Sequence, residues 1–196
     1  MAAHSEKRLI ELLHQTGAIL DGHFVLSSGK HAARYIQCAK LLQHPRLAQR
    51  VCRLLAKKAK GLGPIDAVIG PALGGIVVSY ELARAMGVRS LFTERQDGEM
   101  TLRRGFRIDK GERVLIAEDV ITTGGSSLEV AEVVTASGGK VVGIACIVDR
   151  RPEEIELPFP LVSGVKLVIE IYEPTQCPLC REGVPLIKPG SRGNVV

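Results

Sequence analysis

The clearest chemical signal in the sequence lies between Val114 and Ser126. A run of aliphatic residues ends in two acids, and two more aliphatic residues lead into hydroxyl side chains and glycines: Glu118, Asp119, Val120, Ile121, Thr122, Thr123, Gly124, Gly125 and Ser126. Glycines let the backbone approach an anion closely, hydroxyls donate hydrogen bonds, and amides at a helix N-terminus carry partial positive charge. Residues 122–126, the phosphate loop, are therefore predicted to bind a monophosphate.

The two acids directly before the phosphate loop would repel a phosphate if they pointed at it. Glu118 and Asp119 are instead expected to accept hydrogen bonds from sugar hydroxyls or to lie near a magnesium ion. No lysine follows the glycines, as it would in a GxxxxGK[ST] loop, and the GxGxxG dinucleotide spacing is absent. The pattern thus predicts that phosphate and ribose are bound together.

A second glycine-containing segment, residues 70–76, is called the glycine turn below. It reads Gly-Pro-Ala-Leu-Gly-Gly-Ile after a short apolar run. Gly74 and Gly75 would permit a concavity of backbone amides in front of a helix, which is a natural anion site. Taken alone, the segment is equally well explained as a tight strand-to-helix turn.

Short aliphatic runs that alternate with helical stretches must position these segments. Strands are predicted at residues 66–70, 89–93, 113–118 and 140–148, and helices at 75–86 and 126–136. Strands that are apolar on both sides and separated by helices indicate an α/β fold with a parallel sheet flanked by helices. Ligands bind such sheets at the carboxyl ends of the strands. The charged stretch at 94–110 is expected to be an exposed loop or a loose hairpin.

Composition excludes several classes of protein. With 45% hydrophobic and 24% charged residues among 196, the chain is not disordered, and only four Phe and three Tyr argue against a stacking platform for single-stranded nucleic acid. A net charge of +5 fits a polyanionic small ligand as well as nucleic acid. No apolar stretch is long enough to span a bilayer, so we expect a soluble cytoplasmic protein without membrane partners.

The segment from Val114 to Ser126 resembles the motif with which type I phosphoribosyltransferases bind 5-phosphoribosyl 1-diphosphate (PRPP). The resemblance implies that Glu118 and Asp119 hold the ribose hydroxyls and that the phosphate loop holds the 5′-phosphate. It also implies that the glycine turn, through Leu73 and Gly74, binds pyrophosphate. The implied organisation is an N-terminal helix and hood segment (1–61), a type I phosphoribosyltransferase core (62–172) and a C-terminal tail (173–196).

Three further segments resemble orotate phosphoribosyltransferases in particular. Residues 24–30 with 35–37 match the hood that covers the pyrimidine, residues 70–72 match the pyrophosphate loop, and Arg150 follows the last predicted strand where the family has an arginine that contacts the orotate carboxylate. A guanidinium can pair with a carboxylate that purine bases lack. The resemblance implies that the orotate contacts are Thr122, Arg150, Tyr35 and Ile36. Alone, Arg150 would be explained as a surface charge.

The charged segment at residues 94–106, the lid segment, departs from the family. Many orotate enzymes have several lysines and a histidine there, and lysines in the hood turn and the glycine turn, whereas this chain has three arginines in the lid segment and Ser27 and Gly74 in the turns. Arg95 matches the family's first basic loop residue and is expected to bind PRPP. Arg103 and Arg104 are the candidate catalytic residues that reach the leaving pyrophosphate. The alternative is a solvated charged hairpin.

The resemblance implies that PRPP and orotate react to give orotidine 5′-monophosphate and pyrophosphate in UMP synthesis, with Mg²⁺ carried by PRPP. Family members are commonly homodimers with shared active sites, and a homodimer is expected here. One alternative is a purine or xanthine phosphoribosyltransferase, because base choice resides in the less distinctive hood. Another is a PRPP-sensing regulator that binds nucleic acid, but the complete Glu-Asp motif favours an enzyme without a nucleic-acid partner.

The tail contains a CxxC pair, Cys177 and Cys180, among five cysteines. A tetrahedral zinc site needs four ligands, and no second pair stands at a metal spacing, although a site shared across a dimer could supply four. The spacing therefore favours a metal-free thiol pair, and no protein metal site is predicted. The odd number and wide scatter of the cysteines predict reduced thiols rather than a disulfide framework.

Overall fold

The computed structural model describes residues 2–26 and 28–188, so Ser27 of the hood turn and residues 189–196 of the tail lie outside the described residues. A six-stranded sheet has the order β5-β4-β3-β6-β7-β8, and all its neighbours pair in parallel except the antiparallel β4 and β5. The bounds are β3 (Ala67–Pro71), β4 (Arg89–Gln96), β5 (Glu99–Leu102), β6 (Arg113–Ile121), β7 (Lys140–Asp149) and β8 (Leu161–Lys166). The predicted parallel sheet is confirmed, and β8 is an edge strand that the sequence pattern did not predict.

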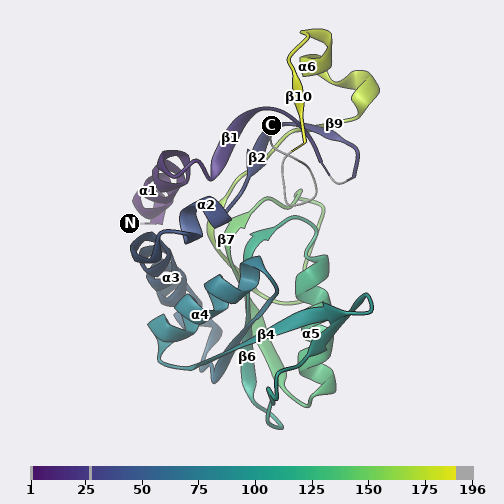
Figure 1. The fold of residues 1–196 in the computed structure, drawn as a ribbon. Helices are drawn as coiled ribbons and strands as arrows, with labels where there is room; N and C mark the ends of the chain where they lie inside the picture. Colours follow the sequence, from purple (N-terminus) through teal and green to yellow (C-terminus); the bar gives the residue numbers. More distant parts are fainter. Residues whose placement is uncertain (1, 27, 189–196) are drawn as a thin grey trace.

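Helices cover both faces of this sheet (Figure 1). On one side lie α1 (Ala2–Gln15), α3 (Pro45–Ala59) and α4 (Gly74–Met86), and on the other lies α5 (Gly125–Ala136). Alternate residues of the central strands supply the two cores, so that Val68 and Leu115 pack towards α3 and α4 whereas Ile69 and Ile116 pack towards α5. Side chains alternate between the faces of a strand, and burial of both faces explains the continuous aliphatic runs.

A second sheet, the hood sheet, lies above the carboxyl ends of the main strands and has the order β10-β1-β2-β9 (Figure 1). Its antiparallel hairpin is formed by β1 (Ile19–Val25) and β2 (His31–Ile36), and its edges by β9 (Ile171–Tyr172) and β10 (Leu186–Ile187). The short helices are α2 (Ala39–Leu42), η1 (Lys60–Leu62), η2 (Pro174–Gln176) and α6 (Pro178–Arg181). The hood sheet thus joins the two ends of the described chain.

The first nine residues of the lid segment, 94–102, belong to a regular hairpin instead of the expected exposed loop or loose hairpin. β4 and β5 pair in antiparallel register from Thr93 opposite Leu102 to Gln96 opposite Glu99. Asp97 and Gly98 between them have φ angles of 53° and 91°. Two consecutive positive φ values are typical of the type I′ turn, for which Asp-Gly is a favoured sequence.

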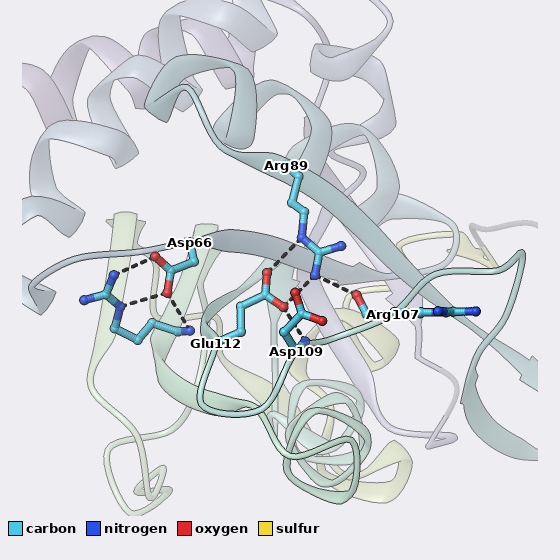
Figure 2. A network of polar contacts seen from close by, with 6 residues as sticks. Asp66, Arg89, Arg107, Asp109 and Glu112 are labelled. Carbon is cyan, nitrogen blue, oxygen red and sulfur yellow. Dashed lines mark hydrogen bonds and ion pairs between the residues drawn. The ribbon is translucent and has the colours of Figure 1, made fainter.

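A network of ion pairs joins residues at the amino ends of β3, β4 and β6 (Figure 2). The phosphate loop follows the carboxyl end of β6 and so lies at the other end of the sheet. The guanidinium of Arg89 donates to Glu112 and, at 2.6 Å, to the carbonyl oxygen of Arg107. Asp66 accepts hydrogen bonds from Arg113, which lower the pKa of Asp66 to about 2. These contacts fix the chain where the loop after the lid segment returns to β6.

No helix among residues 2–26 and 28–188 is long and apolar enough to cross a membrane.

Candidate active site

The two acids stand near the end of β6, which runs three residues further than predicted. The Oε2 atom of Glu118 is buried and has no hydrogen-bond partner among the described residues. Burial, reinforced by the nearby Asp119, raises the pKa of Glu118 to about 8, and the hydroxyl of Ser127 acts in the opposite direction. Burial also raises the pKa of Asp119, although its Oδ1 accepts a hydrogen bond from the backbone N–H of Val120 at 2.9 Å. A buried, unsatisfied carboxyl oxygen is costly, so this arrangement points to a polar ligand.

The glycine turn packs directly against these acids. A Cβ atom at Gly74 would lie 2.7 Å from Cγ of Asp119, and one at Gly70 would lie 2.3 Å from the carbonyl oxygen of Gly75. At Gly70 the clash is with backbone, so glycine is required there, whereas at Gly74 a side chain would need the Asp119 carboxyl group to move. The helix α4 begins at Gly74, and the preceding Leu73 is 83% exposed after a cis peptide bond from Ala72. The fold thus brings the two segments with predicted anion-binding character together at the same edge of the sheet.

The phosphate loop forms a turn into α5. Gly124 caps that helix with a φ of 83°, and a Cβ atom there would lie 2.5 Å from Cδ2 of Leu157. Thr122 and Thr123 are exposed, so their hydroxyls are accessible to a ligand. A hollow of about 260 Å³ is lined by Glu118, Val120, Ile121, Thr122, Thr123, Gly124, Gly125, Ser126, Ser127 and Glu129. The geometry suits a phosphate bound by loop amides and a helix N-terminus.

Two lining residues were missed by the sequence argument. Ser127 is 1% exposed, and its hydroxyl lies close enough to the carboxyl group of Glu118 to lower the pKa of that acid. Glu129 lies one turn into α5. Both residues lie in the first turns of the helix that follows the phosphate loop. Their closeness to that loop in the sequence is the signal that could have added them to the predicted site.

The side chains of two predicted contact residues point into the core instead. Ile121 is 1% exposed and packs with the residues under α5, and Ile36 is 5% exposed and packs on the opposite face. Each is the last residue of its strand, and because side chains alternate between the two faces of a strand, these two side chains point into the core. Any ligand contact from Ile36 or Ile121 is therefore limited to its main chain.

Arg150 begins the chain after β7 and lies beside the phosphate loop, because its backbone N–H donates to the carbonyl oxygen of Ile121 at 2.9 Å. Its guanidinium is partly buried, and burial lowers the pKa of Arg150, whereas the hydroxyl of Tyr35 in the hood sheet opposes that shift. The next residue, Arg151, pairs with Asp149 at 3.0 Å. By contrast, no carboxylate among the described residues pairs with Arg150, which leaves its charge available to an anion.

The lid arginines have different partners. Arg104 Nε and Arg103 Nη1 lie 2.9 and 3.4 Å from Oε1 of Glu94, and no contact between these two arginines and the phosphate loop occurs within the described part of the chain. Arg95 pairs at 2.7 Å with Glu129, which lines the hollow. The structure therefore brings Arg95 to the rim of the hollow and holds Arg103 and Arg104 on β4.

Known proteins resemble this chain over most of its length. A family model for the phosphoribosyl transferase domain matches residues 37–179. The chain is 56% identical over 183 residues to the orotate phosphoribosyltransferase of Caldicellulosiruptor bescii. The matched region covers 93% of this chain and 96% of that protein. It is 54% identical over 187 residues to that of Caldanaerobacter subterraneus, covering 95% and 98%. These relatives favour the orotate enzymes over the purine alternative.

Solved structures agree with this assignment. The crystal structure of orotate phosphoribosyltransferase from Aeropyrum pernix superposes with a TM-score of 0.68 at 30% identity, covering 81% of this chain and 93% of that one. Adenine phosphoribosyltransferase from Trypanosoma brucei, at 19% identity and a TM-score of 0.61, shares the fold alone. With the acids, the glycine turn and the phosphate loop gathered at one edge of the parallel sheet, the chain belongs to the orotate phosphoribosyltransferase family of type I phosphoribosyltransferases.

Proposed function

We propose that this protein transfers the 5-phosphoribosyl group from PRPP to orotate, giving orotidine 5′-monophosphate and pyrophosphate in UMP synthesis. The observation that carries the choice of base is Arg150, a partly buried cation without an acidic partner among the described residues, which lies between the phosphate loop and Tyr35. Orotate differs from uracil by a carboxylate, and a guanidinium can bind it with two parallel hydrogen bonds.

Each part of the site binds a different part of the substrates. Amides and hydroxyls of the phosphate loop bind the 5′-phosphate, and Glu118 with Asp119 accepts hydrogen bonds from the ribose hydroxyls. The amides of the glycine turn face the diphosphate. A ring nitrogen of orotate attacks C1 of the ribose as pyrophosphate leaves, through a transition state with oxocarbenium character. Fixed dipoles and cations stabilise the departing charge, and the hood sheet and lid segment exclude water.

Mg²⁺ fits this site as a companion of PRPP. Carboxylate oxygens are ligands that this hard cation accepts, and the unsatisfied Oε2 atom of Glu118 lies at the hollow. Glu118 and Asp119 would hold the ion's water shell or the ribose hydroxyls, and the ion would neutralise charge on the diphosphate.

A base panel tests the proposed function. Purified protein is incubated with PRPP, Mg²⁺ and each of orotate, uracil, adenine, hypoxanthine, guanine and xanthine, and the nucleotide product is identified by mass. We expect orotidine 5′-monophosphate as the main product. Turnover of a purine without turnover of orotate would overturn the proposal.

The pKa of Glu118 gives a pH dependence to PRPP binding. Because this pKa is about 8 without ligand, binding of PRPP to the carboxylate form must release a proton at lower pH. We expect the Kd for PRPP to fall by up to about tenfold per pH unit as the pH rises from 7 to 8, and to level off above it. Calorimetry in buffers of different ionisation enthalpy would count the proton. In Glu118→Gln this pH dependence should disappear, and a wild-type profile identical to that of Glu118→Gln would contradict the assigned role.

We further propose a homodimer in the cytoplasm. Leu73, Val77 and Tyr80 are 83%, 41% and 62% exposed, and their spacing puts them on one face of α4 and the turn before it. An exposed apolar stripe next to the glycine turn supports contact with a second copy of the chain. All five cysteines are free thiols, which suits a reducing compartment.

A further inference from the structure

Four metal-ligating side chains meet between the hood sheet and the tail. His23 and His31 come from β1 and β2, Cys177 directly precedes α6, and Cys180 lies within that helix. One ligand atom from each residue lies within 4.8 Å of all the others. Cys177 and His23 are 154 residues apart in sequence, so the spacing of the cysteines alone could not reveal this cluster.

The distances within the cluster approach those of a tetrahedral site. His23 Nε2 lies 2.9 Å from His31 Nδ1, Cys177 Sγ lies 3.4 Å from His23 Nε2, and Cys180 Sγ lies 3.3 Å from His31 Nδ1. Tetrahedral zinc with ordinary bond lengths separates two nitrogens by about 3.3 Å and a nitrogen from a sulfur by about 3.6 Å. Small shifts of the side chains would therefore seat an ion among the four atoms.

A contact outside the cluster orients one of the histidines for ligation. His23 Nδ1 lies 2.8 Å from the carbonyl oxygen of Val184. A carbonyl oxygen only accepts hydrogen bonds, so Nδ1 must carry the proton and Nε2 presents its lone pair to His31 and the cysteines. Metal-binding histidines commonly donate their second N–H to a carbonyl oxygen in this way.

Burial of the cluster gives a second argument. His23, His31 and Cys177 are 1%, 6% and 1% exposed, whereas His14 and His44 are exposed. Within the described part of the chain, the polar contacts of the two buried imidazoles are with each other, with the two thiols and with a carbonyl oxygen, and none is with a carboxylate. Two imidazoles and two thiols form a nitrogen and sulfur donor set, which suits zinc and does not suit magnesium or calcium.

We propose that His23, His31, Cys177 and Cys180 bind a structural Zn²⁺ ion within one chain. This departs from the metal-free thiol pair favoured by the sequence, because the fold supplies the two missing ligands from the N-terminal hairpin. All four coordination positions are filled by protein, as in sites whose role is to stabilise structure. Zinc binding displaces the thiol protons of Cys177 and Cys180, which pass to solvent.

The position of the cluster assigns the ion a role in the hood sheet. β10 pairs with β1 at His23, and β9 pairs with β2 at His31, but each pairing spans only two residues. Strands this short provide few hydrogen bonds, so the ion would hold the tail on the hairpin that also carries Tyr35. Loss of the ion should loosen the tail and leave the six-stranded sheet intact.

Metal analysis of the full-length chain tests the site. The chain is expressed without a histidine tag, purified without chelators, and its metals are measured by mass spectrometry. We expect about one zinc ion per chain. Cys180→Ser and Cys177→Ser should each lower zinc content and Zn²⁺ affinity at least about tenfold. Cys180 is exposed, so its substitution leaves the core packing unchanged. Cys52→Ser is the matched control, because Cys52 is a buried thiol outside the cluster, and it should keep the zinc.

Spectroscopy and amide-exchange measurements distinguish a zinc site from a metal-free thiol pair or a disulfide. Co²⁺ added to metal-free reduced protein should give the visible absorption of tetrahedral cobalt and a thiolate charge-transfer band, both lost in Cys180→Ser. Chelation should speed amide exchange in β10 and β9 and not in β6. The proposal is overturned if reduced wild-type protein supplied with Zn²⁺ takes up no metal, if the serine variants retain it, or if the purified chain contains a Cys177–Cys180 disulfide in place of zinc.

Discussion

Replacing Arg103 and Arg104 together by alanine is expected to lower kcat roughly 10²- to 10³-fold while raising the Kd for PRPP much less. Charge on the departing pyrophosphate grows toward the transition state, so contacts that strengthen there accelerate the reaction. Both arginines pair with Glu94 at exposed positions. Exposed pairs contribute little stability, so a polyanion can compete with Glu94 for these two side chains.

Steady-state kinetics and PRPP binding by calorimetry would separate the two effects in this double variant. Arg107→Ala is a suitable control, because Arg107 is an exposed arginine just after the lid segment and only its carbonyl oxygen takes part in the network of Figure 2. We expect the control to keep wild-type kcat. If the double variant also keeps it, Arg103 and Arg104 only form a solvated surface, and the catalytic cation would be sought at Arg95.

Arg150→Gln should abolish the preference for nucleotides that carry a carboxylate. The wild-type protein is expected to bind orotidine 5′-monophosphate roughly 30- to 150-fold more tightly than UMP, as one charge-assisted contact of about 2–3 kcal/mol implies. The two nucleotides differ only by the carboxylate, so UMP serves as the internal control. In Arg150→Gln the two Kd values should become similar, with that for UMP unchanged, and Arg150→Lys should recover part of the difference.

Competition binding of orotidine 5′-monophosphate and UMP to the wild-type protein and each variant would measure the ratio of the two Kd values. A preference for orotidine 5′-monophosphate that survives in Arg150→Gln would show that another group binds the carboxylate. Loss of UMP affinity by the same factor would instead indicate a general effect on the phosphate loop, to which the Arg150 backbone is hydrogen-bonded at Ile121.

A mixture of the two variants tests whether active sites are shared in a dimer. If the lid segment of one chain serves the site of its partner, a dimer of one Arg103→Ala/Arg104→Ala chain and one Arg150→Gln chain has one intact site. Equal mixing after reversible dissociation should then restore about a quarter of wild-type activity, because half of the dimers are mixed. If each chain uses its own lid segment, every site has one defect and no activity returns.

The sequence by itself determined the features that local chemistry encodes. Aliphatic runs indicated the central strands and their burial on both faces, and the order of acids, hydroxyls and glycines from Glu118 to Ser126 predicted a segment that binds phosphate and ribose. These features depend on residues that are close in sequence, where spacing and conformational preference act directly. The Asp97-Gly98 turn also depends on neighbouring residues, although the charged stretch around it was expected only to be an exposed loop or a loose hairpin.

Only the tertiary structure decided which distant groups meet. It placed Gly74 against Asp119, left Arg150 without an acidic partner among the described residues, and turned the side chains of Ile36 and Ile121 into the core. It also brought two histidines of the first hairpin to the cysteines of the tail. Such contacts depend on strand order and on the packing of edge strands as short as β9 and β10, which have almost no periodic signal. A sequence pattern reports which face of an element is apolar, whereas the partner of that face is set by packing across the whole chain.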